Sequence, residues 1–180
     1  MLEKMILAGF GGQGIMLLGK LLCTTFMEEG MHVTWIPSYG AEQRGGTANC
    51  HVIVSSKPVG SPMVEHATTV LVMNQPSFEK FKARLVPGGT LFVNTSLIKI
   101  EGVPENVKVV EIPATDTASK LGDVRLANMI VLGAMMKHKN WLSAEKFSTG
   151  LKAYLPGKKA AMLDLNRKAI QAGIEIAAGQ

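Results

Sequence analysis

Short apolar segments alternate with amphipathic segments along the first two thirds of the chain. The apolar segments are rich in valine, isoleucine and leucine and end at glycine, proline or polar residues, a pattern typical of strands inside a sheet. Strands are expected over residues 4–9, 32–36, 47–55, 69–73, 90–94 and 107–112.

Helical spacing of apolar positions begins after the first strand, over residues 15–29, with Gly30 as a stop signal. A short helix is expected over residues 77–85, and the last third of the chain is predicted to be helical. The helices expected there cover residues 115–121, 124–137, 143–153 and 158–178. Asp123 and Ser143 stand where N-caps belong.

Strands that alternate with helices predict an α/β fold, here three layers (α/β/α) around a largely parallel sheet. The short interval between strands 32–36 and 47–55 allows an antiparallel pair, so a mixed sheet is expected. Residues 1–180 contain no internal repeat and no linker, and we expect a single domain.

Composition narrows the class of protein. Hydrophobic residues make up 47% of the chain, enough for a buried core. No apolar run approaches the ~20 residues that a membrane-spanning helix needs, and the apolar stretch before Gly9 is too short for a secretion signal. A cytoplasmic protein without a membrane partner is expected.

The net charge of +5 raises the question of a nucleic-acid partner. The basic residues are scattered, however, and aromatic residues make up only 6% of the chain, which argues against a nucleic-acid surface. A basic surface equally suits an acidic partner or a phosphorylated ligand.

Residues that bind metals or perform catalysis are not grouped in this sequence. Cys23 and Cys50 lie far apart without C-x-x-C spacing, which argues against a disulfide framework, a zinc site or an iron–sulfur cluster within this chain. The histidines lack ligand spacing, and His51 is expected to be structural. Asp116 and Asp123 are better explained as helix caps than as an acid–base pair.

Gly9-Phe-Gly-Gly-Gln-Gly14 satisfies G-x-G-x-x-G between a strand and a helix. Backbone N–H groups at the helix start and the positive end of its dipole favour an anion, and glycines let a phosphate approach. Two other interpretations stay open, a tight turn for packing only and a full NAD(P) site. The NAD(P) interpretation lacks the acidic residue expected after the second strand, which ends at Ile36-Pro37-Ser38.

The segment Ser38-Tyr-Gly-Ala-Glu-Gln-Arg-Gly-Gly46 has no apolar periodicity and is expected to be a long loop. Arg44 is suited to a carboxylate or phosphate and Glu42 to orienting it. An internal Glu42–Arg44 pair that only ties the loop down remains the alternative.

Together, the two glycine-containing motifs resemble the gamma subunit of 2-oxoacid:ferredoxin oxidoreductases. The resemblance continues through residues 61–62, 71–74, 87–89, 125–129 and 132–134, and so covers nearly the whole chain. Phe10 and Ile15 beside the first motif are more similar to the 2-oxoglutarate or ketoisovalerate type than to the pyruvate type.

This resemblance implies a subunit of an anaerobic oxidoreductase that converts a 2-oxoacid, CoA and oxidised ferredoxin to acyl-CoA, CO2 and reduced ferredoxin. It further implies that thiamine diphosphate, Mg and 4Fe-4S clusters reside in the alpha, beta and delta-type subunits, and that this chain supports assembly and CoA binding. No catalytic residue is assigned to it. The residues expected to contact CoA or a partner subunit are Gly11, Gly12, Gln13, Gly14, Tyr39, Glu42, Arg44 and Gly45. A stand-alone NAD(P)-binding module and a pure scaffold remain alternatives, and a homodimer of the isolated chain stays open.

Overall fold

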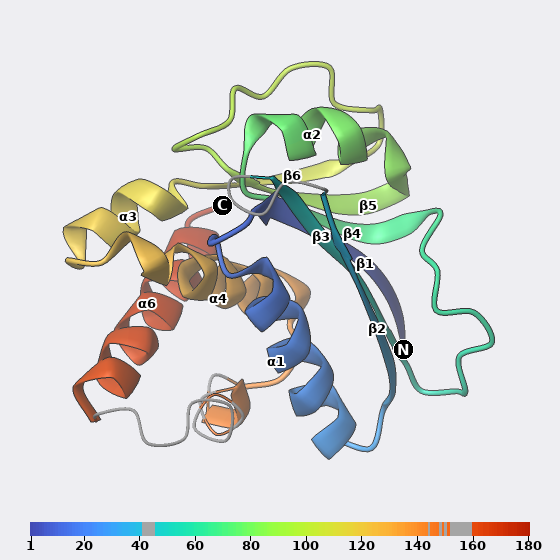
Figure 1. The fold of residues 1–180 in the computed structure, drawn as a ribbon, viewed down its shortest axis with the longest axis horizontal. Coiled ribbons are helices and arrows are strands. Elements are labelled where there is room, and N and C mark those ends of the chain that lie inside the picture. The colour runs from blue at the N-terminus through green and yellow to red at the C-terminus, as the bar shows by residue number, and fades with distance from the viewer. Residues whose placement is uncertain (41–45, 144, 148, 150, 152–159) are drawn as a thin grey trace.

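The computed structural model describes residues 1–40, 46–143, 145–147, 149, 151 and 160–180. These residues form one six-stranded sheet with helices on both faces (Figure 1). The strands are β1 (Leu2–Phe10), β2 (His32–Tyr39), β3 (Thr47–Ser55), β4 (Ala67–Val72), β5 (Leu85–Asn94) and β6 (Lys108–Ile112). The helices are α1 (Ile15–Glu28), α2 (Gln75–Phe81), α3 (Ala114–Lys120), α4 (Ala127–Lys139) and α6 (Ala160–Ala178), with short 3-10 turns at Lys82–Arg84 and Val124–Leu126.

The strand order is β2-β3-β1-β4-β5-β6. β3 is antiparallel to both of its neighbours, β2 and β1, whereas β1, β4, β5 and β6 pair in parallel. The expected mixed, largely parallel sheet is therefore confirmed, and the antiparallel pair falls where the short interval in the sequence allowed it.

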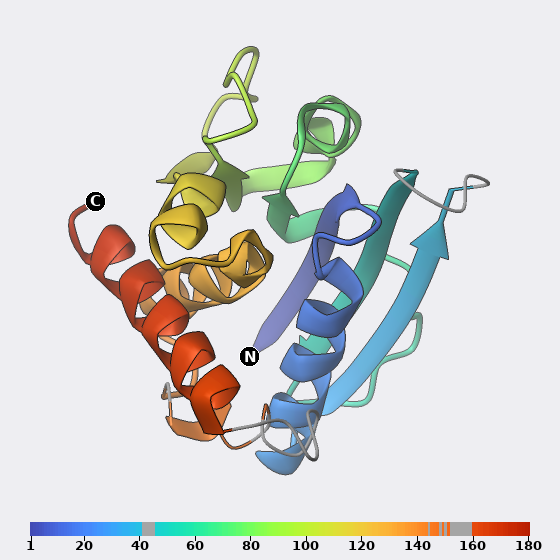
Figure 2. The same ribbon diagram turned by 60° about the vertical axis from the view of Figure 1, so that its left-hand side comes forward.

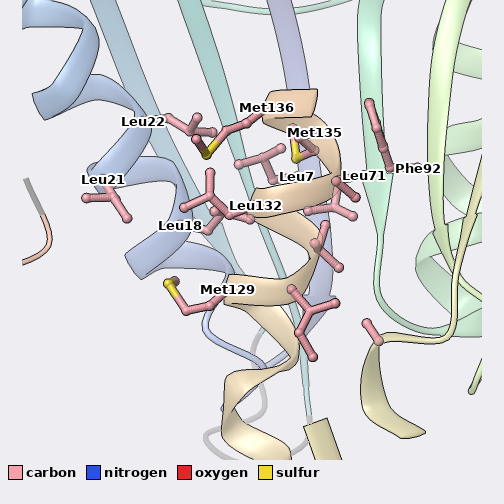
Figure 3. Close-up of a cluster of buried hydrophobic side chains, with 14 of the residues drawn as sticks. Leu7, Leu18, Leu21, Leu22, Leu71, Phe92, Met129, Leu132, Met135 and Met136 are labelled. Carbon is pink, nitrogen blue, oxygen red and sulfur yellow. The ribbon is translucent and has the colours of Figure 1, made fainter. Parts of the chain in front are cut away.

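One face of the sheet is covered by α1 and α4, and their apolar side chains interlock over the strands (Figure 3). Every residue of α4 from Ala127 to Met136 is buried, because α6 packs on the side of α4 that faces away from the sheet (Figure 2). The two helices touch through their backbones. A Cβ added at Gly133 would overlap the carbonyl group of Ile170, and one at Gly173 would overlap that of Ile130.

The opposite face is covered less deeply. α2 lies against β1 and β4, and the extended segments 56–66 and 95–107 complete the layer with a few apolar side chains such as Val64 and Ile98. The expected three-layer α/β/α architecture is confirmed, with one layer thicker than the other. None of the described helices has the length and apolar character needed to cross a bilayer.

Three local expectations need correction. β2 continues through Tyr39 instead of ending at Ile36, since an edge strand tolerates Pro37, which has no N–H to donate. The helix expected over 124–137 begins with a 3-10 turn, in which Asp123 accepts a hydrogen bond from the Arg125 N–H at 2.9 Å as the expected cap. Asp116, in contrast, lies within the first turn of α3, whose N-cap is Pro113.

Two expected helices fall partly outside the described residues. The helix predicted over 143–153 is described only at residues 145–147, 149 and 151, all of which are helical. The helix predicted over 158–178 is described from Ala160 onward, as α6.

Candidate functional site

The carboxyl ends of β1, β4, β5 and β6 meet at one edge of the sheet, the edge at which open α/β folds bind ligands. The glycine loop, residues 11–14, follows β1 at this edge. The Gly11 N–H donates to the carbonyl of Gly46 at 3.0 Å, which brings the loop beside the start of β3. The two motifs that stood out in the sequence are therefore adjacent in space.

The backbone at Gly11 and Gly12 is exposed. Gly12 has φ of +100°, a conformation that L side chains rarely adopt, and a Cβ there would meet no atom of the described residues within 4 Å. α1 begins just after the loop without a side-chain cap, so the positive end of its dipole faces the same edge. An anionic group could approach this part of the loop closely.

Gln13 points into the protein. Its Oε1 accepts hydrogen bonds from the Phe10 N–H at 2.7 Å and from the Asn74 Nδ2 at 3.3 Å. Its Nε2 donates to the Met73 carbonyl at 3.1 Å. The side chain therefore fixes the shape of the loop and ties it to the end of β4.

Gly14 is fixed from the opposite side. Its φ of +75° favours glycine, and a Cβ there would overlap the carboxamide of Asn128 in α4. The Asn128 Nδ2 lies 3.5 Å from the Gly14 carbonyl, a long hydrogen bond. The end of the loop thus packs against α4 and is closed to a ligand.

Two more buried asparagines, at the ends of β4 and β5, extend this network. Asn74 accepts from the Ser77 N–H at 2.9 Å and so caps α2. Asn94 accepts from the Ala114 N–H at 3.1 Å and donates to the Thr115 hydroxyl at 2.9 Å, which anchors α3. Sequence reasoning did not single out these residues; an asparagine at the end of an apolar strand was the available signal.

Tyr39 is the last residue of β2, and its side chain is 67% exposed. The Gly40 N–H donates to the Thr47 carbonyl at 2.8 Å, which closes the β2–β3 ladder beyond Tyr39. Glu42, Arg44 and Gly45 lie outside the described residues, so their predicted roles stay predictions.

The strand order argues against the NAD(P) interpretation. In a dinucleotide-binding fold the second strand lies beside the first and carries the acid that binds the ribose. Here β3 lies between β1 and β2, so the end of β2 is about 10 Å from β1 at two strand spacings. Among the described residues, that end carries Tyr39 and no acid.

Both cysteines are free and lie near α1 and the strands beneath it. Burial raises the pKa of Cys23 and of Cys50 to about 12, which keeps both thiols protonated and unreactive. Within the described part of the chain, no three His, Cys, Asp or Glu side chains come together to hold a metal.

The fold and the site define an α/β domain that presents a glycine loop at the carboxyl edge of its sheet. The family model for pyruvate ferredoxin/flavodoxin oxidoreductases matches residues 4–176, and the chain belongs to this family.

Curated relatives that match the chain include subunits of two kinds, VorA and KorC. It is 37% identical over 170 residues to the ketoisovalerate oxidoreductase subunit VorA of Methanothermobacter thermautotrophicus, covering 94% of this chain and 35% of the relative. It is 31% identical over 182 residues to the 2-oxoglutarate synthase subunit KorC of Methanocaldococcus jannaschii, covering 98% of this chain and 95% of the relative. The chain therefore spans about a third of the first kind of relative and nearly all of the second.

Solved structures with the same fold were also found. The keto/oxoacid ferredoxin oxidoreductase gamma subunit from Geobacter sulfurreducens matches with a TM-score of 0.82 and 29% identity over 99% of both chains. The 2-oxoglutarate:ferredoxin oxidoreductase from Magnetococcus marinus, solved with 2-oxoglutarate, coenzyme A and succinyl-CoA bound, gives a TM-score of 0.92. That match covers 99% of this chain and 31% of the other at 24% identity, and indicates the fold alone.

Proposed function

We propose that this chain is the gamma subunit of a multi-subunit 2-oxoacid:ferredoxin oxidoreductase and forms one gamma-type domain over residues 1–180. The complex would convert a 2-oxoacid, CoA and oxidised ferredoxin to acyl-CoA, CO2 and reduced ferredoxin. The observation that carries the proposal is the end-to-end match to KorC, a subunit of nearly the same length. The relatives favour 2-oxoglutarate or ketoisovalerate as substrate.

The contribution of this chain is to support assembly and to contact CoA at the glycine loop. The exposed backbone of Gly11 and Gly12 fits a phosphate of CoA, since none of the described residues occupies the space beside Gly12 and the positive end of α1 lies behind it. Gln13 and Gly14 act through the shape of the loop. The proposal includes a contact by Tyr39, Glu42, Arg44 and Gly45, on the sequence alone for the last three, since Arg44 suits a phosphate.

The partners in this proposal are the alpha, beta and delta-type subunits, which carry thiamine diphosphate, Mg and the 4Fe-4S clusters. The reaction chemistry takes place on those groups, and ferredoxin is reached through those subunits. This chain binds and positions, and none of its residues makes or breaks a bond. The proposal places the complex in the cytoplasm and includes no nucleic-acid or membrane partner.

A first experiment is anaerobic affinity purification of the chain from its host, followed by CoA-dependent reduction of a dye with several 2-oxoacids. Co-purified thiamine and iron–sulfur subunits with this activity support the proposal and identify the substrate. A chain that elutes alone with a bound dinucleotide overturns it.

A pair of glycine variants then tests the contact with CoA. Gly12 and Gly30 both have positive φ and open space around the missing Cβ, so alanine imposes a similar backbone strain of about 1–2 kcal/mol at each. Gly12→Ala is expected to raise the KM for CoA about tenfold, because the new methyl group occupies the space of the phosphate. Gly30→Ala, at the far end of α1, is expected to leave the KM unchanged.

A further inference from the structure

The two edges of the sheet are built differently. The β6 edge is five residues long and carries Lys108 and Glu111, and the side chain of Gln180 hydrogen-bonds both backbone groups of Glu111. The β2 edge is eight residues long, with no described element beyond it. Charged and covered edges are the usual protection against unwanted strand pairing, and only β6 has it.

Charge is absent from the whole β2–β3 pair. Residues 30–40 and 46–56 contain no Asp, Glu, Lys or Arg, although such residues make up 18% of the chain. The strand register places His32, Thr34, Ile36 and Ser38 of β2 opposite Ser55, Ile53, His51 and Asn49 of β3. These eight residues form the side of the pair that faces away from α1, here called the neutral face. No described helix lies over it (Figure 2).

Asn49 on the neutral face is 7% exposed, and its carboxamide bonds to none of the described residues. The carboxamide is also not among the polar atoms that are sealed from solvent without a partner. An amide that is largely buried and can bond only to solvent suits a group that arrives from outside.

The neutral face continues into a hollow of about 550 Å³ beside β1 and the segment 56–63. Ile53 and Ser55 belong to both, and large exposed apolar side chains surround the hollow: Met1 and Leu2, each about half exposed, and Met63, 56% exposed. The lining of the hollow also includes Lys4 and Lys57, so the uncharged surface is the neutral face alone. An uncharged surface bordered by exposed apolar side chains is typical of permanent protein interfaces. The neutral face does not suit nucleic acid or an acidic electron carrier, which bind basic surfaces.

We propose that the neutral face is the surface on which another subunit of the oxidoreductase packs, with Asn49 paired to a backbone or carboxamide group of that subunit. The inference rests on the proposed function and adds to it the location and the uncharged character of the contact. In VorA this domain is about a third of a longer chain, so it is permanently joined to further polypeptide there. A permanent neutral interface fits that arrangement.

Pro37 favours a different chain over a second copy as the occupant. The Gly40 N–H pairs with the Thr47 carbonyl, so by alternation the backbone groups of Val33, Trp35, Pro37 and Tyr39 point away from β3. Pro37 leaves a gap among the N–H donors of this edge. If two copies of this chain paired through β2 about a twofold axis, the gap would occur twice. A strand of a different subunit would meet the gap only once.

Two serine variants test the surface. Ser38 is exposed on the neutral face, and Ser119 is exposed on α3, on the other side of the molecule. We expect Ser38→Arg to weaken binding of the chain to the purified thiamine and iron–sulfur subunits about tenfold or more, because it buries an unpaired charge. Ser119→Arg should stay within about twofold of the unmodified chain. Sedimentation of each variant mixed with those subunits under anaerobic conditions measures both binding affinities.

Each other outcome has a defined meaning. If Ser38→Arg binds like the unmodified chain, the inference is wrong and the proposed function stands. If Ser38→Arg abolishes only self-association of the chain, the face joins two copies and the inference is wrong again. If the unmodified chain binds no such subunit, the proposed function itself fails.

Asn49→Leu separates a binding role from a structural one. Removing an unpaired buried amide should raise the Tm of the chain alone, while the complex loses about fivefold in affinity because the group of the partner is left unpaired. A structural role for Asn49 would lower the Tm instead, and that result would overturn the pairing assigned to it.

Discussion

The layers that cover the two faces of the sheet differ in thickness, and they are called the deep layer and the thin layer below. On one face α1 and α4 lie against the strands and α6 packs over α4, whereas the other face carries the short helix α2 and extended segments. The glycine loop lies at the start of α1 and touches α4 through Asn128, so it is supported by the deeper layer. The thinner side includes the neutral face. The support of the glycine loop and the surface proposed for a partner are therefore on opposite faces.

The largest effect should come from breaking the deep layer at the contact between α4 and α6. Gly173→Leu forces a side chain into the carbonyl group of Ile130, and the helices must separate. We expect a loss of at least about 4 kcal/mol in the free energy of unfolding, measured by urea denaturation. Gly179→Leu is the control, because the nearest atom to its Cβ is at an ordinary 3.7 Å. Equal stability of both variants would show that the helices do not cross this closely.

Matched truncations on each face compare the two layers directly. Phe26 of the deep layer packs edge-to-face on Trp141 and Phe147, with ring centroids 5.6 and 6.1 Å away. Phe78 of the thin layer is equally buried but belongs to the short helix α2, with the Lys82 ammonium 4.7 Å from its ring centroid. We expect Phe26→Ala to cost about 4 kcal/mol and Phe78→Ala about 3, because a short helix settles more easily into a cavity. Thermal denaturation with calorimetry gives both values, and the reverse order would contradict the comparison.

Much of the fold was predictable because β1, β4 and β5 contain continuous apolar runs and α1 has a periodic apolar face. The inserted antiparallel strand was predictable only as a consequence of the short interval between residues 36 and 47. The contact of α6 with α4 was not predictable. Gly133 and Gly173 have no side chains that would form a pattern, and they matter only because the two helices cross closely at these positions.

For the site, the position was predictable from the sequence, but the role of each residue was not. The motif located the loop, and its helix-start context favoured an anion, but it did not separate exposed from buried positions. Gln13 looks like a ligand-binding side chain in the sequence, yet Phe10, Met73 and Asn74 already engage it. Such partners are distant in the chain and become evident only when β1 and β4 pair.

A smaller effect is expected at Gln13, where the loop is joined to the strand ends. Gln13→Ala leaves the Phe10 N–H and the Met73 carbonyl without their present partner, and we expect a loss of about 2 kcal/mol in the free energy of unfolding. In the complex the KM for CoA should rise more than kcat falls, because the loop loses its shape. Gln171→Ala, an exposed change on α6, is the control and should cost less than about 0.5 kcal/mol.

The smallest effect is expected when the pH is lowered, and it concerns the thin layer, which contains α2 and the segment 56–66. His51 Nδ1 accepts a hydrogen bond from the Val64 N–H at 3.2 Å and so ties the segment 56–66 to β3. Burial and the positive charge of Arg84 lower the pKa of His51 below 6.5, so folding favours its neutral form. The stabilisation is present above pH 6.5 and is lost as the pH falls through the lower folded-state pKa.

Protonation of His51 removes the acceptor, and the Val64 amide should then lose protection from hydrogen exchange by about fivefold between pH 7.5 and pH 5, after correction for intrinsic rates. Amides of α4, in the deep layer, should keep their protection over the same range. His51→Asn removes the titrating group, and the pH dependence at Val64 should disappear with it. If the dependence persists in that variant, another group loosens the thin layer, and the contrast between the two faces does not originate at His51.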